Sequence, residues 1–307
     1  MLRKCFAARR APYSVLYGAL YGALYGALPL LLCQALPALA QAGGDTTLAV
    51  APVPQVTATV PPAEATAAAS PWSANMTLTS QYVSRGFRQT WGKPAVQGGI
   101  DYAHPSGFSA GTWMSSISDK FIEGGTVEWD LYAGYTGTIG DFVYAGQVYY
   151  YLYPGAKLQY AQTKYNYGEA VASLTWKWFN VKYWLTYTPD YFGYNSASLM
   201  TGNNLHSRGS GYLDVNGTFD LGHGVTLLLH YGQERVRNFA AYSFRDVRVA
   251  LSKAFESGWT LTGAYTRGWG RTDVYDNYTT GALDSSGNPA VSNPLKSTFL
   301  VSLTKTF

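Results

Sequence analysis

Charged residues and cysteine are both scarce in this chain of 307 residues. Only 13% of the residues are charged, and the two cysteines, Cys5 and Cys33, both lie near the N-terminus. The rest of the chain therefore has no thiol for a disulfide or for a cysteine metal site. After residue 42 there is also no apolar run of the roughly 20 residues that a membrane-spanning helix needs. The sequence thus excludes a bundle of membrane helices.

The net charge of +4 comes entirely from the N-terminal region. Arg3, Lys4, Arg9 and Arg10 precede the first acidic residue, Asp45, so residues 43–307 hold 18 basic and 18 acidic side chains. A balanced chain lacks the basic field that proteins use to bind nucleic acid. We expect no nucleic-acid partner.

Aromatic residues are plentiful at 16%, with 26 tyrosines. Many aromatic residues and few charges are typical of a membrane β-barrel, whose outer face meets lipid and whose strand ends carry aromatic girdles. This composition favours a barrel of alternating strands.

The segment Ser297–Phe307 (STFLVSLTKTF) alternates with a period of two residues. Phe299, Val301 and Leu303 share one face, and hydroxyl residues occupy the other. This period predicts a strand, and the related phrase at Val249–Phe255 (VALSKAF) predicts a second strand in the same direction. We expect Phe307 to act as an assembly signal for the barrel-assembly machinery of the outer membrane.

Residues 1–42 predict a secretory signal peptide. A basic start, an apolar run from Val15 to Leu39 and the small-residue exit Ala40-Gln41-Ala42 are its three parts. The glycines at 18, 22 and 26 have the spacing of a helix-pairing face, so a retained helix is the alternative. Residues 43–72, rich in Ala, Pro and Thr, predict a disordered periplasmic tether, and residues 73–307 predict the barrel.

The barrel region divides into twelve predicted strands, with one hairpin of uncertainty around Asp273–Ala282. Their bounds are Asn75–Gly86, Ala95–His104, Phe108–Ile117, Thr126–Thr138, Phe142–Tyr153, Tyr167–Trp178, Val181–Thr188, Gly211–Leu221, Val225–Glu234, Phe244–Phe255, Trp259–Gly270 and Ser297–Phe307. Tight turns, such as His104–Gly107 and Phe179-Asn180, alternate with longer connections. This pattern predicts an all-β, transmembrane, antiparallel up-and-down barrel with short periplasmic turns and long extracellular loops.

Several phrases in this region resemble the TorF-type porin family of Gram-negative bacteria. The resemblance rests on Leu78–Trp113, Glu128–Tyr135 (EWDLYAGY), Tyr153–Gly155 and Thr188–Gly193 (TPDYFG), which occur in order. It covers about residues 73–307 and implies an outer-membrane porin without implying a particular solute.

If the apolar half of each strand faces lipid, the polar half faces the lumen. A charge that faced lipid at mid-bilayer would cost about 2–4 kcal/mol, so the charged residues are expected inside. The candidate pore-lining residues are Gln81, Arg85, Asp101, Glu128, Asp130, Lys177, Lys182, Asp214, Asp246 and Arg248, and Glu169 falls on the same face. Arg85 is the preferred lining cation, and Arg88 is placed in the first outer loop, where lipopolysaccharide phosphate is a candidate partner.

Two interpretations of these charges remain open. They form a constriction that selects small solutes or ions, or they pair across the lumen and close it, because about 8 strands give a filled interior and about 16–18 an aqueous channel. A closed structural or surface-recognition barrel, acting through its loops, is therefore the alternative to a porin.

An enzyme is the less favoured hypothesis. Some outer-membrane barrels are acyl hydrolases, which require a nucleophile beside a base, and none of the four histidines has a glycine-flanked serine elbow beside it. We expect no catalytic residues, cofactor or metal. The expected partners are outer-membrane lipid and lipopolysaccharide, the assembly machinery and small solutes, and a homo-oligomer remains possible.

Overall fold

The computed structural model describes residues 70–307, and every structural statement below concerns that part of the chain. The predicted signal peptide, residues 1–42, and nearly all of the predicted tether, residues 43–72, lie outside the described residues.

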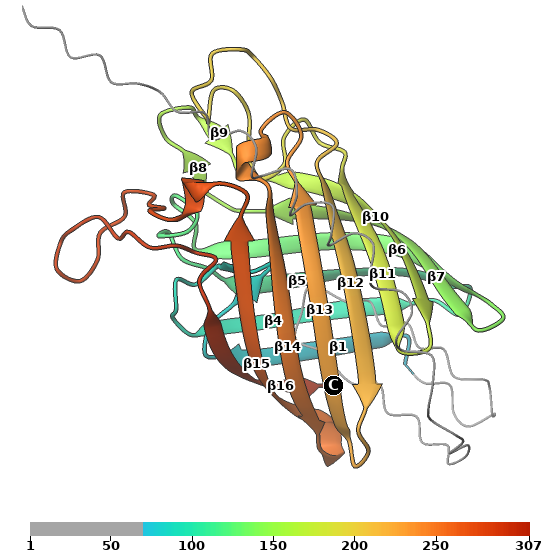
Figure 1. The fold of residues 1–307 in the computed structure, drawn as a ribbon. Helices are drawn as coiled ribbons and strands as arrows, with labels where there is room; N and C mark the ends of the chain where they lie inside the picture. The colour runs from blue at the N-terminus through green and yellow to red at the C-terminus, as the bar shows by residue number, and fades with distance from the viewer. Residues whose placement is uncertain (1–69) are drawn as a thin grey trace, which may run out of the picture. The chain divides into compact units, whose positions relative to one another are not determined.

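Twelve strands form one closed antiparallel barrel, which confirms the predicted fold class and strand number (Figure 1). The barrel strands are β1 (Trp72–Thr79), β4 (Ala95–Ala103), β5 (Phe108–Ser116), β6 (Val127–Ile139), β7 (Phe142–Leu152), β10 (Tyr167–Trp176), β11 (Phe179–Thr186), β12 (Gly211–Asp220), β13 (Val225–Arg235), β14 (Phe244–Ala254), β15 (Trp259–Gly270) and β16 (Thr298–Thr306). Each barrel strand pairs with the next along the chain, and β1 pairs with β16 to close the sheet. Closure leaves no unpaired sheet edge.

The remaining elements are short. They are β2 (Val83–Ser84) with β3 (Phe87–Arg88), β8 (Lys157–Leu158) with β9 (Thr163–Lys164), and the 3-10 turns η1 (Ala240–Tyr242), η2 (Glu256–Gly258) and η3 (Asp273–Tyr275). Within residues 70–307, no helix combines the length and the hydropathy needed to cross a membrane. The predicted uncertainty around Asp273–Ala282 is resolved, since that segment contributes η3 and no barrel strand.

The last strand shows how alternation in the sequence sets the two faces of the wall. Phe299 and Val301 point outward, with exposed fractions of 77% and 56%, whereas Thr298, Ser302 and Thr304 are buried inside. At the seam, the hydroxyls of Thr77 and Thr304 lie 2.8 Å apart and hydrogen-bond within the barrel. Apolar residues outside and hydroxyls inside are the reverse of a soluble barrel and match a barrel that is surrounded by lipid.

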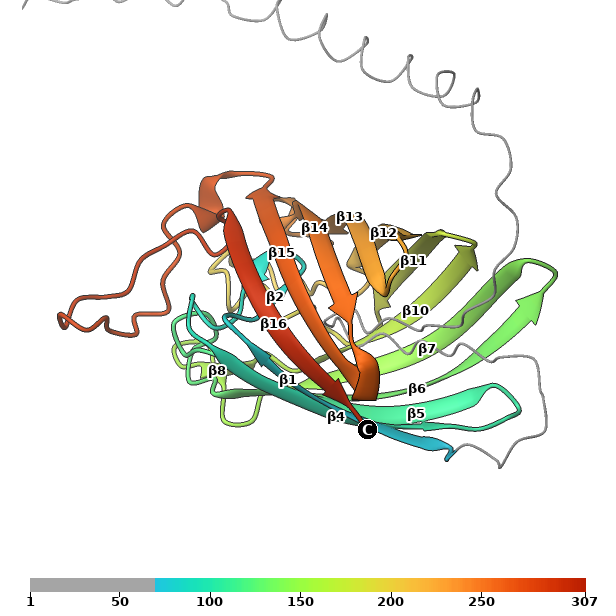
Figure 2. The same cartoon turned by 90° about the horizontal axis from the view of Figure 1, so that it is seen from below.

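Connections at the two ends of the barrel differ in length. One end, the short-turn end, has connections of two to four residues between consecutive strands, as in residues 104–107 and 140–141. The other end, the long-loop end, carries every longer connection and all of the small hairpins (Figures 1 and 2). The predicted turn at Phe179-Asn180 is wrong by two residues, because Lys177 adopts a positive φ of 52° and the turn forms at Lys177-Trp178.

The C-terminal end of the first predicted strand, Asn75–Gly86, is wrong. The wall strand β1 stops at Thr79, and residues 83–88 form an inner hairpin of β2 and β3. The chain turns back there because Arg85 and Gly86 have positive φ values of 45° and 80°. The alternation already breaks at this point, since Ser80 and Gln81 are both polar and Tyr82 and Val83 are both apolar. The predicted strand was extended past this break.

The inner hairpin packs against the inside of the barrel. Val83 belongs to a buried apolar cluster with Leu228, Ala250, Ala264 and Leu300, which come from β13 to β16. At the hairpin tip, a Cβ added to Gly86 would lie only 2.7 Å from the Cβ of Asp246 on β14. The hairpin therefore occupies part of the lumen.

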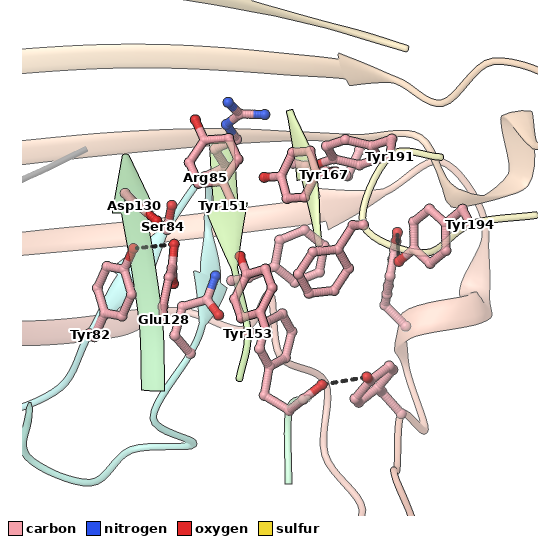
Figure 3. A pocket seen from close by; sticks show the side chains of 17 residues that line it. Tyr82, Ser84, Arg85, Glu128, Asp130, Tyr151, Tyr153, Tyr167, Tyr191 and Tyr194 are labelled. Atoms are coloured by element: carbon pink, nitrogen blue, oxygen red, sulfur yellow. Dashed lines mark hydrogen bonds between the residues drawn. The ribbon is translucent and has the colours of Figure 1, made fainter. Parts of the chain in front are cut away.

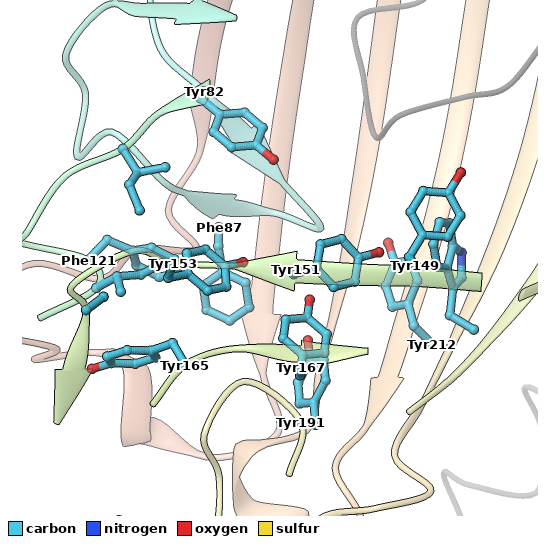
Figure 4. Packing of buried hydrophobic residues seen from close by; sticks show 14 of the residues in the cluster. Tyr82, Phe87, Phe121, Tyr149, Tyr151, Tyr153, Tyr165, Tyr167, Tyr191 and Tyr212 are labelled. Atoms are coloured by element: carbon cyan, nitrogen blue, oxygen red, sulfur yellow. The ribbon is translucent and has the colours of Figure 1, made fainter. Parts of the chain in front are cut away.

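Three tyrosines near the end of β7 lie inside the barrel and not in an outer aromatic girdle. Tyr149, Tyr151 and Tyr153 are 1%, 4% and 2% exposed, and Figure 4 shows their rings in the same region as Tyr167 and Tyr191. Only Tyr150 of that run, 37% exposed, points outward. Successive residues of a strand point to opposite faces, so a run of tyrosines cannot all belong to one girdle.

Candidate functional site

The tip of the inner hairpin carries Arg85 into the lumen. Its guanidinium makes a two-point ion pair with Glu169 of β10, with Nη2–Oε2 and Nη1–Oε1 distances of 2.5 and 3.0 Å. A second carboxylate, Glu234 of β13, has an oxygen 3.5 Å from Nη1. The Arg85 side chain is 7% exposed and both carboxylates are fully buried, so the hairpin is tied electrostatically to two different strands.

Two aromatic rings complete the surroundings of Arg85. Its guanidinium carbon lies 4.9 Å from the centre of the Trp184 ring and 4.5 Å from that of Tyr212. Burial alone would lower the pKa of Arg85, but Glu169 raises it, and the net pKa lies well above its ordinary value. Arg85 therefore remains a fixed positive charge.

A cavity of about 40 Å³ lies beside the hairpin (Figure 3). Its polar wall includes Ser84, Arg85, Glu128 and Asp130, and most of its other wall residues are tyrosine and phenylalanine. Glu128 and Asp130 stand two residues apart on β6, so both point into the lumen. Within residues 70–307, no group of three His, Cys, Asp or Glu residues is arranged to hold a metal ion.

A second polar group surrounds His230 on β13. Nδ1 of His230 lies 3.2 Å from Asp214 and 3.0 Å from the Asn216 oxygen, and Nε2 lies 3.1 Å from Asp246. The Tyr212 hydroxyl donates to Asp246 over 2.9 Å. These hydrogen bonds link β12, β13 and β14 across the inner face of the wall.

The structure places the predicted lining residues in different settings. Glu128, Asp130, Asp214 and Asp246 are buried on the inner face, and Asp101, Lys182 and Arg248 are partly buried in inward positions of their strands. Asp101 accepts a 2.6 Å hydrogen bond from the Tyr132 hydroxyl. Gln81 lies between β1 and the inner hairpin and is not part of a wall strand. Its side-chain amide donates a hydrogen bond to the Phe299 carbonyl of β16 over 2.9 Å.

Two basic residues do not lie where the sequence placed them. Lys177 is exposed in the turn between β10 and β11, with Nζ 4.9 Å from the centre of the Trp176 ring, so it is not on the inner wall. Arg88 is only 9% exposed, and its Nε donates to Gln81 over 3.2 Å. Arg88 is therefore a buried residue of the inner hairpin and not an exposed residue of an outer loop. Phe307, the expected assembly signal, is 71% exposed at the short-turn end.

Sequence reasoning missed the partners that the lumen brings together. Glu234, Trp184, Tyr212 and His230 all have inward positions on their strands, and the same alternation that selected Glu128 could have selected them. The contacts of Glu234, Trp184 and Tyr212 with Arg85 could not be inferred, because they depend on the inward fold of residues 83–88. The contact of Tyr212 with His230 joins the neighbouring strands β12 and β13 and does not depend on that fold.

A histidine–carboxylate pair exists in one long loop. Nδ1 of His206 lies 2.7 Å from Asp190. Among the described residues, no serine hydroxyl hydrogen-bonds to His206, and its neighbour Ser207 donates to the Tyr194 carbonyl over 2.6 Å. This pair therefore lacks the nucleophile that a hydrolase site requires.

A closed antiparallel barrel with an apolar exterior and a charged, aromatic interior defines the class of this protein as a transmembrane β-barrel. Within that class, the chain belongs to the family described as "Bacterial protein of unknown function (Gcw_chp)", whose model matches residues 63–307. The family description assigns no activity and does not carry the TorF name.

The chain is also similar in fold to solved structures of outer-membrane proteins. The structure titled "KdgM porin" is 8% identical and has a TM-score of 0.45, over 76% of this chain and 99% of that one. A NanC porin is 9% identical with a TM-score of 0.45, over 76% of this chain and 98% of that one. The outer membrane protein opdK of Pseudomonas aeruginosa is 13% identical with a TM-score of 0.34, over 70% of this chain and 57% of that one. No curated protein matches the chain.

Proposed function

We propose that this protein is an outer-membrane porin through which small solutes or ions diffuse passively along a narrow, mixed-charge lumen. The observation that carries the proposal is the charged ring around Arg85, in which a buried cation and the carboxylates of β6, β10 and β13 face one interior. Charged side chains at a constriction select among permeating ions. The resemblance of residues 73–307 to TorF-type porins supports the same function.

The two ends of the barrel support an orientation. In outer-membrane barrels the short turns face the periplasm and the longer loops face outward. We accordingly assign residues 104–107 and the other short turns to the periplasmic side. The long loops then meet the lipopolysaccharide leaflet, and solutes enter through them.

A closed barrel is the second candidate function, and one observation favours it. The inner hairpin and the aromatic residues around it fill the lumen near the long-loop end, where the cavity holds only about 40 Å³. Such a barrel acts as a structural or surface-recognition protein through its loops.

Single-channel recording in planar bilayers tests the porin proposal. Protein purified in detergent from the outer membranes of a Gram-negative host should give discrete conductance steps. Arg85→Glu should shift the reversal potential in a salt gradient toward cation preference, because it removes the cation that pairs with Glu169 and Glu234. A verified folded barrel that gives no steps overturns the porin and supports the closed barrel.

A further inference from the structure

Two carboxylates beside the inner hairpin have no cationic partner. Arg85 is engaged by Glu169 and Glu234, and no ion pair within 4 Å involves Glu128 or Asp130 in the described part of the chain. Arg85 is also the only Lys or Arg among the residues that line the cavity. The cavity wall thus has more negative than positive side chains.

Asp130 is the most isolated of these carboxylates. It is 0% exposed, and neither of its side-chain oxygens has a hydrogen-bond partner among residues 70–307. On Glu128, one oxygen accepts a 3.4 Å hydrogen bond from the Tyr82 hydroxyl and the other has no partner within the same residues. Buried polar groups are normally satisfied, and a buried carboxylate without a partner is strongly unfavourable. Such a carboxylate is neutralised either by taking up a proton or by binding a donor or a positive charge.

The cavity restricts what that partner can be. A volume of about 40 Å³ accommodates a particle of the size of a water molecule, with about one or two waters beside it, and excludes a sugar or an amino acid. The absence of any three-residue metal-binding group in residues 70–307 disfavours a multidentate divalent site. A small monovalent cation fits the cavity volume and does not need a three-residue metal-binding group.

The aromatic wall favours the same kind of ligand. Tyr151 and Tyr167 stack with their ring centres 4.5 Å apart, and both line the cavity together with Tyr82 and Tyr153. The faces of aromatic rings attract cations, most strongly where water is excluded. Figure 3 shows these tyrosines and the carboxylates Glu128 and Asp130 around one space.

From these observations we infer that Glu128 and Asp130 form a binding site for a small monovalent cation, ammonium or an alkali ion. The carboxylate oxygens bind the ion, and the tyrosine rings and hydroxyls surround it. The site does not require the barrel to conduct, since a bound ion would also neutralise the interior of a closed barrel.

Cation titration of the full-length protein in detergent tests the site. Intrinsic fluorescence is followed while ammonium chloride or potassium chloride replaces N-methyl-D-glucamine chloride at constant ionic strength. We expect a saturable change with ammonium or potassium, and the two salts identify which ion is preferred. Asp130→Asn should weaken binding by about tenfold or more, as expected for the loss of a charged ligand, and Glu128→Gln should weaken it less. The control is Asp141→Asn, which removes an exposed carboxylate from the turn after the same strand and should leave the binding constant unchanged.

Two results would overturn the site. One is a linear, unsaturable response in the folded wild-type barrel; the other is an unchanged binding constant in folded Asp130→Asn. If Asp130→Asn does not fold, Glu128→Gln tests the cation site instead. A glutamine at position 128 has nearly the same volume as the glutamate and can still accept the hydrogen bond from Tyr82. Saturable binding together with a silent bilayer would retain the cation site and reject the porin.

Discussion

The guanidinium of Arg85 and the carboxylate of Glu169 form a buried two-point ion pair between the inner hairpin and the barrel wall, with a shortest distance of 2.5 Å. Residue 85 follows β1, and residue 169 lies on β10, almost halfway around the barrel from it. The pair therefore fixes a segment that is not part of the wall. It also sets the position of the charged ring on which the proposed function depends.

Removal of Arg85 should destabilise the barrel more than removal of an exposed arginine. Arg85→Ala leaves Glu169 and Glu234 buried without their cation, and breaking a buried pair in this way costs about 3–5 kcal/mol. The measurement is guanidinium-induced unfolding in phospholipid vesicles, followed by tryptophan fluorescence. Arg245→Ala is the matched control, because Arg245 is exposed and lies 5.8 Å from the centre of the Trp269 ring; its cost should stay within about 1 kcal/mol.

A double substitution separates the ion pair from simple loss of volume. Arg85→Met with Glu169→Gln removes both charges of the closest pair and retains most of the packing. It should be less destabilising than Arg85→Ala alone, since it leaves one fewer uncompensated carboxylate. Equal unfolding midpoints for Arg85→Ala and Arg245→Ala would show that the buried pair does not hold the hairpin.

Gly86 should tolerate a methyl group much less well than Gly155. Both glycines have positive φ, 80° and 78°, so the backbone strain of an alanine is the same at the two positions. A Cβ at Gly86 would lie 2.7 Å from the Cβ of Asp246, whereas one at Gly155 meets nothing within 4 Å. We expect Gly86→Ala to cost about 1–3 kcal/mol more than Gly155→Ala in the same unfolding assay. Equal costs would mean that the hairpin tip does not press on β14.

The wall of the barrel could be predicted from the sequence, and the contents of its lumen could not. Alternation with a period of two is a local property, so it located β16 and most other strands to within two residues. The alternation breaks at residues 80–83, before the inner hairpin. The inward course of the hairpin depends on the positive φ of Arg85 and on contacts with residues more than 100 positions away, such as Asp246. The sequence therefore predicted Arg85 as a lining cation but not Glu169 and Glu234 as its partners.

Replacement of the inner hairpin tests whether it narrows the lumen. Residues 80–94 connect β1 to β4, and a short Gly-Ser linker between these neighbouring strands would preserve the wall. Glu169→Gln and Glu234→Gln accompany the replacement, because both carboxylates lose their arginine. We expect single-channel conductance to rise several-fold in planar bilayers.

The control for this experiment is an equivalent change outside the barrel. Residues 283–289 are exposed in the longest connection at the long-loop end, and their shortening should leave the conductance at the wild-type value. Unchanged conductance in the folded hairpin replacement would show that the hairpin does not limit passage.

An arginine on the outer face tests whether the apolar exterior contacts lipid. Val249 is 45% exposed and lies midway along β14, where Val249→Arg should place a charge at the centre of the bilayer. The expected loss in the free energy of unfolding, measured in phospholipid vesicles, is about 2–4 kcal/mol. Leu221 is a matched control because it is 54% exposed and lies in the turn after β12, so Leu221→Arg should cost about 0–1 kcal/mol near the interface. Similar costs for the two variants would indicate that the exterior of the strands does not face a hydrocarbon core.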